Sequence, residues 1–201
     1  MNRCWGIVCW FPIQPCKCVS KATIELRNLM RRLWSEHVAW TRATVSGLVF
    51  NTPDASLVVA RLLQNTQDMG DAIRPYYGET AAQKYSQLLM EHITLAGDLV
   101  KAMAEGNVGK AADIERNWFQ NGDQIAVFWS SVNPYLPLKE FIKMFYEHLS
   151  FIKQGMDSMF SKDFKAGVEV FDKMETEALE MSDMIAGGIV KQFPGMFMPL
   201  C

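Results

Sequence analysis

The three histidines of this sequence share one local pattern, which is its strongest chemical signal. Each follows a glutamate inside an apolar segment, giving the pairs Glu36-His37, Glu91-His92 and Glu147-His148. The interval from the first histidine to the second is nearly the same as that from the second to the third. Imidazole and carboxylate groups are common protein ligands of transition metals. The pattern therefore predicts a shared site, provided that the fold brings the three pairs together.

Helical patterns account for nearly all of the chain that follows position 19. Long helices are predicted over residues 20–50, 79–104, 107–132, 137–160 and 163–190, with a short one over 52–63. Ser20, Thr52 and Asn107 are candidate helix N-caps. Pro75 and Gly78 mark a connector between helices. Because no segment alternates as a strand does, we expect an all-α fold, an up-and-down bundle of five long helices and one or two short ones.

Each long helix carries a polar residue within the apolar stripe that a bundle would bury. Side chains on one face of a helix recur every three or four residues. That spacing places on the buried faces His37, His92, Asn121, His148 and Glu177. Neighbouring residues point about 100° apart on a helix, so Glu36, Glu91 and Glu147 are expected at the flanks of the stripes. There they could serve as further metal ligands or as acceptors that orient the imidazoles.

Three interpretations of this polar layer remain open. The first is a divalent metal, either iron, zinc or manganese, because bundle proteins hold such ions with imidazoles and carboxylates from facing helices. The candidate ligands are His37, His92, His148, Glu177, Glu36, Glu91 and Glu147. The second is a hydrogen-bonded layer that fixes helix register in a non-enzymatic structural or interaction protein. The third is an open ligand pocket.

Known catalytic motifs do not occur in this sequence. There is no nucleophile elbow, Walker-type loop or dinucleotide-binding glycine fingerprint. The Glu-x-x-His pairs of ferritin-like di-iron proteins are also missing. Any catalysis would therefore depend on the bound metal, and the functions to expect are metal sequestration or the handling of oxygen and peroxide.

Composition limits the partners and the compartment. The net charge is −2 and no basic tract occurs, so nucleic acid is not an expected partner. No apolar run approaches the roughly 20 residues of a membrane-spanning helix. All five cysteines lie near the ends of the sequence, at Cys4, Cys9, Cys16, Cys18 and Cys201. We expect a cytoplasmic helical bundle over residues 20–193 between tails at 1–19 and 194–201, and leave self-association open.

A resemblance to a known family rests on the runs LWSEHVAWTR, RPYYG, NPYLP, EHLSF, ETEALEMSDM and GIVKQFP. Over residues 24–194 the chain resembles a family of small, uncharacterised helical proteins of spore-forming Gram-positive bacteria. Some members are labelled acetylglutamate kinase, but the glycine-rich phosphate loop of such a kinase is missing here. The repeated histidine helices are more distantly similar to ferritin-like metal-binding bundles, which implies a metal site.

Overall fold

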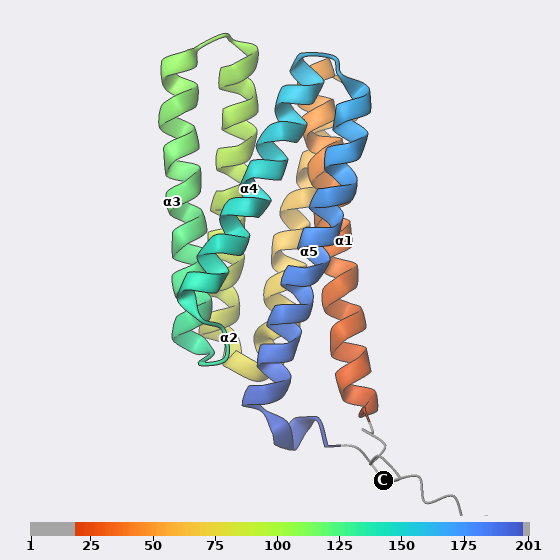
Figure 1. Cartoon of the computed structure of the whole chain (residues 1–201), viewed down its shortest axis with the longest axis vertical. Helices are drawn as coiled ribbons and strands as arrows, with labels where there is room; N and C mark the ends of the chain where they lie inside the picture. Colours follow the sequence, from red (N-terminus) through yellow and green to blue (C-terminus); the bar gives the residue numbers. More distant parts are fainter. Residues whose placement is uncertain (1–18, 199–201) are drawn as a thin grey trace, which may run out of the picture.

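A computed structural model describes residues 19–198, and this part of the chain is built from helices (Figure 1). The elements are α1 (Lys21–Phe50), α2 (Ala55–Ala104), α3 (Val108–Val132), α4 (Leu138–Phe160), α5 (Phe164–Gln192) and the 3-10 turn η1 (Pro194–Met196). No strand occurs within the described range. The prediction of an all-α fold is confirmed. No helix in that range is both long enough and apolar enough to cross a membrane.

The longest helix, α2, is bent at Gly78 into two arms, residues 55–77 and 79–104. Gly78 has φ 78° and ψ 177°, a conformation that is essentially restricted to glycine. The first arm was predicted to end near residue 63, which is wrong. Residues 64–77 remain helical because Asn65, Met69 and Ile73, spaced by four, are buried side chains of this arm. Pro75 does not end the helix either.

The ends of the helices agree with two of the three predicted caps. The side chain of Ser20 accepts a hydrogen bond from the backbone N–H of Thr23, and that of Asn107 accepts one from Lys110. The N-cap of α2 is Asp54 instead of the predicted Thr52. The hydroxyl of Thr52 instead donates to the Asp54 carboxylate at 2.7 Å.

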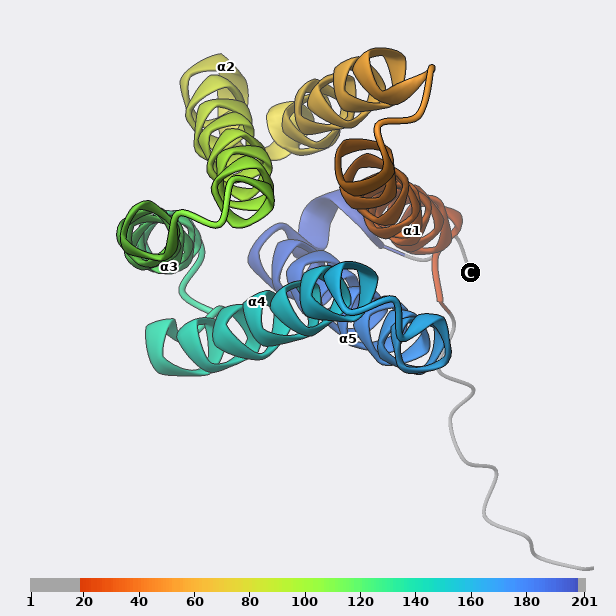
Figure 2. The same cartoon turned by 90° about the horizontal axis from the view of Figure 1, so that it is seen from above.

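Three antiparallel helical hairpins follow one another along the chain (Figure 1). Hairpin 1 pairs α1 with the first arm of α2, hairpin 2 pairs the second arm with α3, and hairpin 3 pairs α4 with α5. Seen from above, the helices form a ring, and α5 packs back against α1 to close it (Figure 2). The hairpin is therefore the repeating unit of the fold.

Equivalent positions of the hairpins are buried in the same core. Residues separated by the same spacing as successive histidines occupy matching places on the first helix of each hairpin. Examples are Met30, Tyr85 and Phe141, which are all buried. Matching places on the second helix are filled by Met69, Ile125 and Met181. The nearly constant spacing of the histidines is thus one part of a repeat that also sets the apolar core.

The ends of the chain fall largely outside the described range. The five cysteines and almost all of the predicted tail 1–19 lie there, so those predictions stay untested. Residues 194–196, predicted to begin a C-terminal tail, form η1. Phe197 follows it and is buried, stacked on Tyr76 with ring centroids 5.7 Å apart. The bundle therefore extends at least to Phe197.

Candidate functional site

Each histidine is buried and bonded to a side-chain oxygen on the other helix of its own hairpin. The relative exposures of His37, His92 and His148 are 3%, 2% and 2%. Their Nδ1 atoms lie 3.1, 2.8 and 2.7 Å from oxygens of Asn65, Asn121 and Glu177, respectively. The three bonds occupy equivalent places in the repeat, because these oxygen-bearing residues are evenly spaced along the chain. The site is thus a layer of three matched pairs.

The orientation of each asparagine fixes the tautomer of its histidine. The Asn121 amide N–H donates to the Leu88 carbonyl at 3.2 Å, which turns the amide oxygen toward His92. That oxygen can only accept a hydrogen bond, so Nδ1 of His92 carries the proton and Nε2 carries a lone pair. Asn65 is held in the same way by the Leu33 carbonyl at 3.1 Å. Both asparagines therefore leave an acceptor nitrogen on the far side of the imidazole ring.

Hairpin 3 replaces the amide with a carboxylate. Glu177 accepts the Nδ1–H of His148 through Oε2, and its other oxygen, Oε1, is buried with no hydrogen-bond partner among the described residues. His148 thus resembles the other two histidines in using Nδ1 for this bond. A buried, partly satisfied carboxylate is a costly feature in a core, so it is the least expected member of the layer.

The imidazoles lie among aromatic side chains at one level of the bundle. The ring centroids of His37 and His148 are 6.2 Å apart. Trp34 meets both rings edge-on, at 5.8 and 6.2 Å. Phe145 lies 6.1 Å from His92 and 6.4 Å from His148. The expectation that the three histidines share a level of the bundle agrees with these contacts.

Burial keeps two of the imidazoles neutral. Loss of hydration lowers the pKa of His37 to about 4, and the nearby His148 acts in the same direction. Loss of hydration also lowers the pKa of His92 to about 3, against the opposing effect of its bond to Asn121. Both groups are therefore uncharged at neutral pH, where they can accept a hydrogen bond or bind a metal but cannot act as efficient proton donors.

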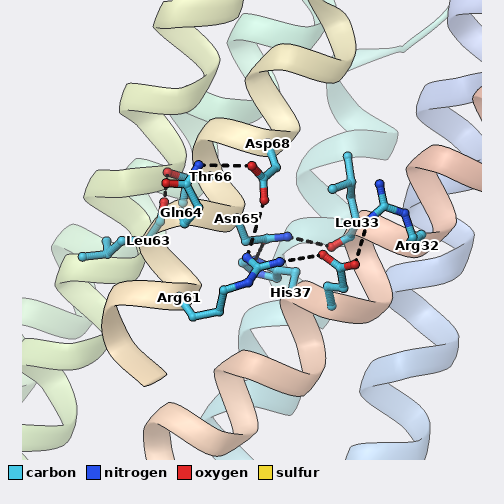
Figure 3. Close-up of polar contacts among 10 residues, drawn as sticks. Arg32, Leu33, His37, Arg61, Leu63, Gln64, Asn65, Thr66 and Asp68 are labelled. Atoms are coloured by element: carbon cyan, nitrogen blue, oxygen red, sulfur yellow. Dashed lines mark hydrogen bonds and ion pairs between the residues drawn. The ribbon is translucent and has the colours of Figure 1, made fainter. Parts of the chain in front are cut away.

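The glutamates that precede the histidines do not join this layer. Glu91 and Glu147 are exposed to solvent. Glu36 is held by Arg32 and Arg61, both at 2.9 Å, in a partly exposed network. Figure 3 shows these two arginines beside His37 and Asn65. The step of about 100° between neighbouring residues turns these carboxylates away from the core. Their predicted role as metal ligands or as acceptors for the imidazoles is therefore not supported.

Sequence reasoning missed Asn65, the partner of His37. The predicted helix ended near residue 63, so no stripe was traced through this position. A usable signal was present, because Asn65, Asn121 and Glu177 recur at equal intervals, as the histidines nearly do. Asn121 and Glu177 were found from helical spacing alone and lie, as expected, beside the imidazoles.

No model of a known family, no curated protein and no solved structure matches this chain. Function must therefore be argued from the side chains themselves. Within residues 19–198, no group of three or more His, Cys, Asp and Glu side chains stands in an arrangement that could hold a metal ion. The imidazole layer is consequently not a closed metal site in the described conformation.

Proposed function

We propose that the protein binds a divalent transition metal through the Nε2 atoms of His37, His92 and His148. The single observation that carries this proposal is that each Nδ1 is engaged by a side-chain oxygen. Metal-binding histidines usually donate the other ring N–H to such an oxygen, which orients the ring and fixes its tautomer. Nε2 of His92 is buried without a hydrogen-bond partner in the described part of the chain, as a nitrogen reserved for a ligand would be.

The chemistry of the donors narrows the choice of metal. Imidazole nitrogens suit zinc and iron, whereas manganese prefers oxygen ligands, so zinc or iron is the expected ion. Glu177, Asn65 and Asn121 act as orienting groups in this proposal, because their oxygens already hold the imidazoles. Sequestration of the metal, or oxygen and peroxide chemistry at it, is the function that would follow.

Metal binding requires the three imidazoles of the layer to move closer together. Zinc–nitrogen bonds are about 2.0–2.1 Å long, so two imidazoles on one tetrahedral ion have ring centres roughly 5 Å apart. The His37 and His148 ring centroids, at 6.2 Å, are farther apart than that. Because no group of three ligands stands ready within residues 19–198, the ion would have to draw His92 toward the other two rings.

Elemental analysis tests the proposal directly. Full-length protein purified after growth with added iron, zinc or manganese should hold about one ion per chain, since one set of three imidazoles makes one site. Replacement of any one histidine by alanine should remove the ion. Asn121→Ala should weaken affinity by roughly tenfold to a hundredfold through loss of ring orientation. Glu91→Gln is the matched control, because its exposed carboxylate should contribute nothing.

A structural layer is the second candidate, and one observation favours it. Every histidine bond joins the two helices of one hairpin at the same place in the repeat, which would fix their register. In that case His92→Ala lowers stability although no metal is present to be lost. The double change His92→Leu with Asn121→Leu would then be nearly neutral, because neither partner is left unpaired. Protein that stays free of metal under all growth conditions would refute the metal proposal.

The remaining sequence expectations belong to the same proposal. We propose an up-and-down bundle that acts in the cytoplasm without a nucleic-acid partner, with self-association left open. Support comes from the near balance of 20 basic and 22 acidic residues, which provides no strong attraction to a polyanion. A nucleic-acid binding assay at low salt and a sedimentation measurement test these two points.

A further inference from the structure

A small cavity adjoins the histidine layer where α1, both arms of α2, α3 and α4 meet. Its volume is about 20 Å³, and His37 and His92 both form part of its wall. Most of the wall is apolar, with side chains such as Leu62, Ile93 and Ile152. The cavity is therefore enclosed largely by groups that cannot form hydrogen bonds.

Polar atoms without partners gather at this one cavity. Eight buried side-chain nitrogen and oxygen atoms lack a hydrogen-bond partner among residues 19–198. Four of them belong to residues of the cavity wall: Thr41 Oγ1, Thr44 Oγ1, His92 Nε2 and Trp118 Nε1. Buried polar groups in folded proteins are nearly always paired. These four groups are the ones with which a molecule bound in the cavity would form hydrogen bonds.

We propose that this cavity binds a neutral molecule of about two non-hydrogen atoms that both donates and accepts hydrogen bonds, the class of methanol, hydroxylamine and hydrogen peroxide. Nε2 of His92 can only accept, because Asn121 fixes the proton on Nδ1. The Trp118 indole N–H can only donate. The ligand must therefore present both functions, while the hydroxyls of Thr41 and Thr44 can serve either one.

Size and charge limit the ligand further. A single water needs about 10–15 Å³ on this scale, so 20 Å³ admits one or two atoms of that size. No lysine, arginine, aspartate or glutamate lines the cavity. An ion would find no compensating charge in the wall, so the ligand is neutral.

This inference stands apart from the metal proposal. A metal on His92 would occupy Nε2 and leave Trp118, Thr41 and Thr44 as the unpaired polar groups of the cavity wall. A metal-free chain offers all four groups. Binding of the small ligand to metal-free protein can therefore succeed where metal binding fails, and the reverse also holds.

Methanol and xenon distinguish a polar site from an apolar void. Full-length protein freed of metal by a chelator is titrated with methanol while the indole N–H signal of Trp118 is followed by NMR. The signal is identified by its loss in Trp118→Phe. We expect a saturable shift with a dissociation constant no tighter than the millimolar range, since two non-hydrogen atoms limit the affinity. Xenon, which has no hydrogen-bonding groups, should give no comparable saturable shift.

Two variants locate the binding. Thr44→Val keeps the shape of the side chain and removes a hydroxyl, so methanol affinity should fall about fivefold to tenfold. Ala96→Leu adds bulk to the cavity wall and should abolish the shift in protein that remains folded by circular dichroism. Thr94→Val is the control, because Thr94 is exposed and its hydroxyl donates to the Met90 carbonyl at 2.8 Å.

Three results would overturn the inference. The first is the absence of a saturable methanol shift in folded protein, which is expected if the cavity holds only water. The second is equal binding of xenon and methanol. The third is an unchanged methanol affinity in Thr44→Val.

Discussion

Acid should destabilise this protein well before its carboxylates titrate, because His37 and His92 are neutral when folded. Their pKa values are about 4 and about 3 in the folded chain, against 6.5 for an ordinary histidine. Between those values the unfolded chain binds more protons than the folded one, so stability falls as the pH falls. One pKa unit corresponds to about 1.36 kcal/mol. A change from pH 7 to pH 5 should therefore cost about 2 kcal/mol for each histidine, or about 4 kcal/mol for both.

Urea unfolding at pH 7, 6 and 5 measures this loss. Free aspartate and glutamate have pKa values of about 3.9 and 4.3, so most carboxylates stay ionised over this interval. A chelator in every sample removes the separate effect of acid on any bound metal. His92→Gln should reduce the pH dependence by about half, since one of the two neutral imidazoles is gone. Equal stability at pH 7 and pH 5, or an unchanged slope in His92→Gln, would refute the assignment of buried neutral histidines.

Three glycine-to-alanine substitutions should change the free energy of unfolding for different reasons, and all three effects can be measured by urea unfolding. Gly78→Ala should cost about 1–3 kcal/mol through backbone strain alone, because a Cβ there would meet no atom within 4 Å. Gly187→Ala, inside α5 and equally uncrowded, should instead stabilise by about 0.5–1 kcal/mol. Gly70→Ala should cost about 1–3 kcal/mol through overpacking, since its Cβ would clash with the Ser86 side chain and lie 2.8 Å from the Ala82 carbonyl oxygen. Adding Ser86→Ala should recover only part of that loss, and full recovery would show that the carbonyl contact is unimportant.

Local patterns predicted the elements of this fold well. Helical spacing identified the buried faces, so His37, His92, Asn121, His148 and Glu177 were all placed correctly in the core. The caps of α1 and α3 followed from residue type, because a serine or asparagine side chain satisfies the free N–H groups of a first helical turn. These features depend on a few neighbouring residues, which is why a sequence reveals them.

Features that depend on distant residues were harder to foresee. The stretch that contains Pro75 and Gly78 suggested a connector, yet packing of Met69 and Ile73 into the core keeps the first arm of α2 helical. The predicted helix ended near residue 63, so Asn65 was not recognised as a buried helical residue. Without Asn65, the sequence did not reveal that each histidine bonds to a residue of its own hairpin. The cavity beside His92 arises from several helices together, so no local pattern could indicate it.

Hairpin 3 differs from the other two hairpins in the residue that bonds its histidine. This difference makes it possible to distinguish a metal-binding layer from a purely structural one. Asparagine serves His37 and His92, so an amide is sufficient to fix the register of a hairpin. Hairpin 3 has Glu177 instead, which adds a buried carboxylate with one unpaired oxygen. Such a charge is costly in a core unless a positive group compensates it. If the layer is only structural, Glu177→Gln preserves the bond to His148 and should leave stability unchanged or higher. If the carboxylate serves to support a bound cation, the same change should lower metal affinity by roughly tenfold or more.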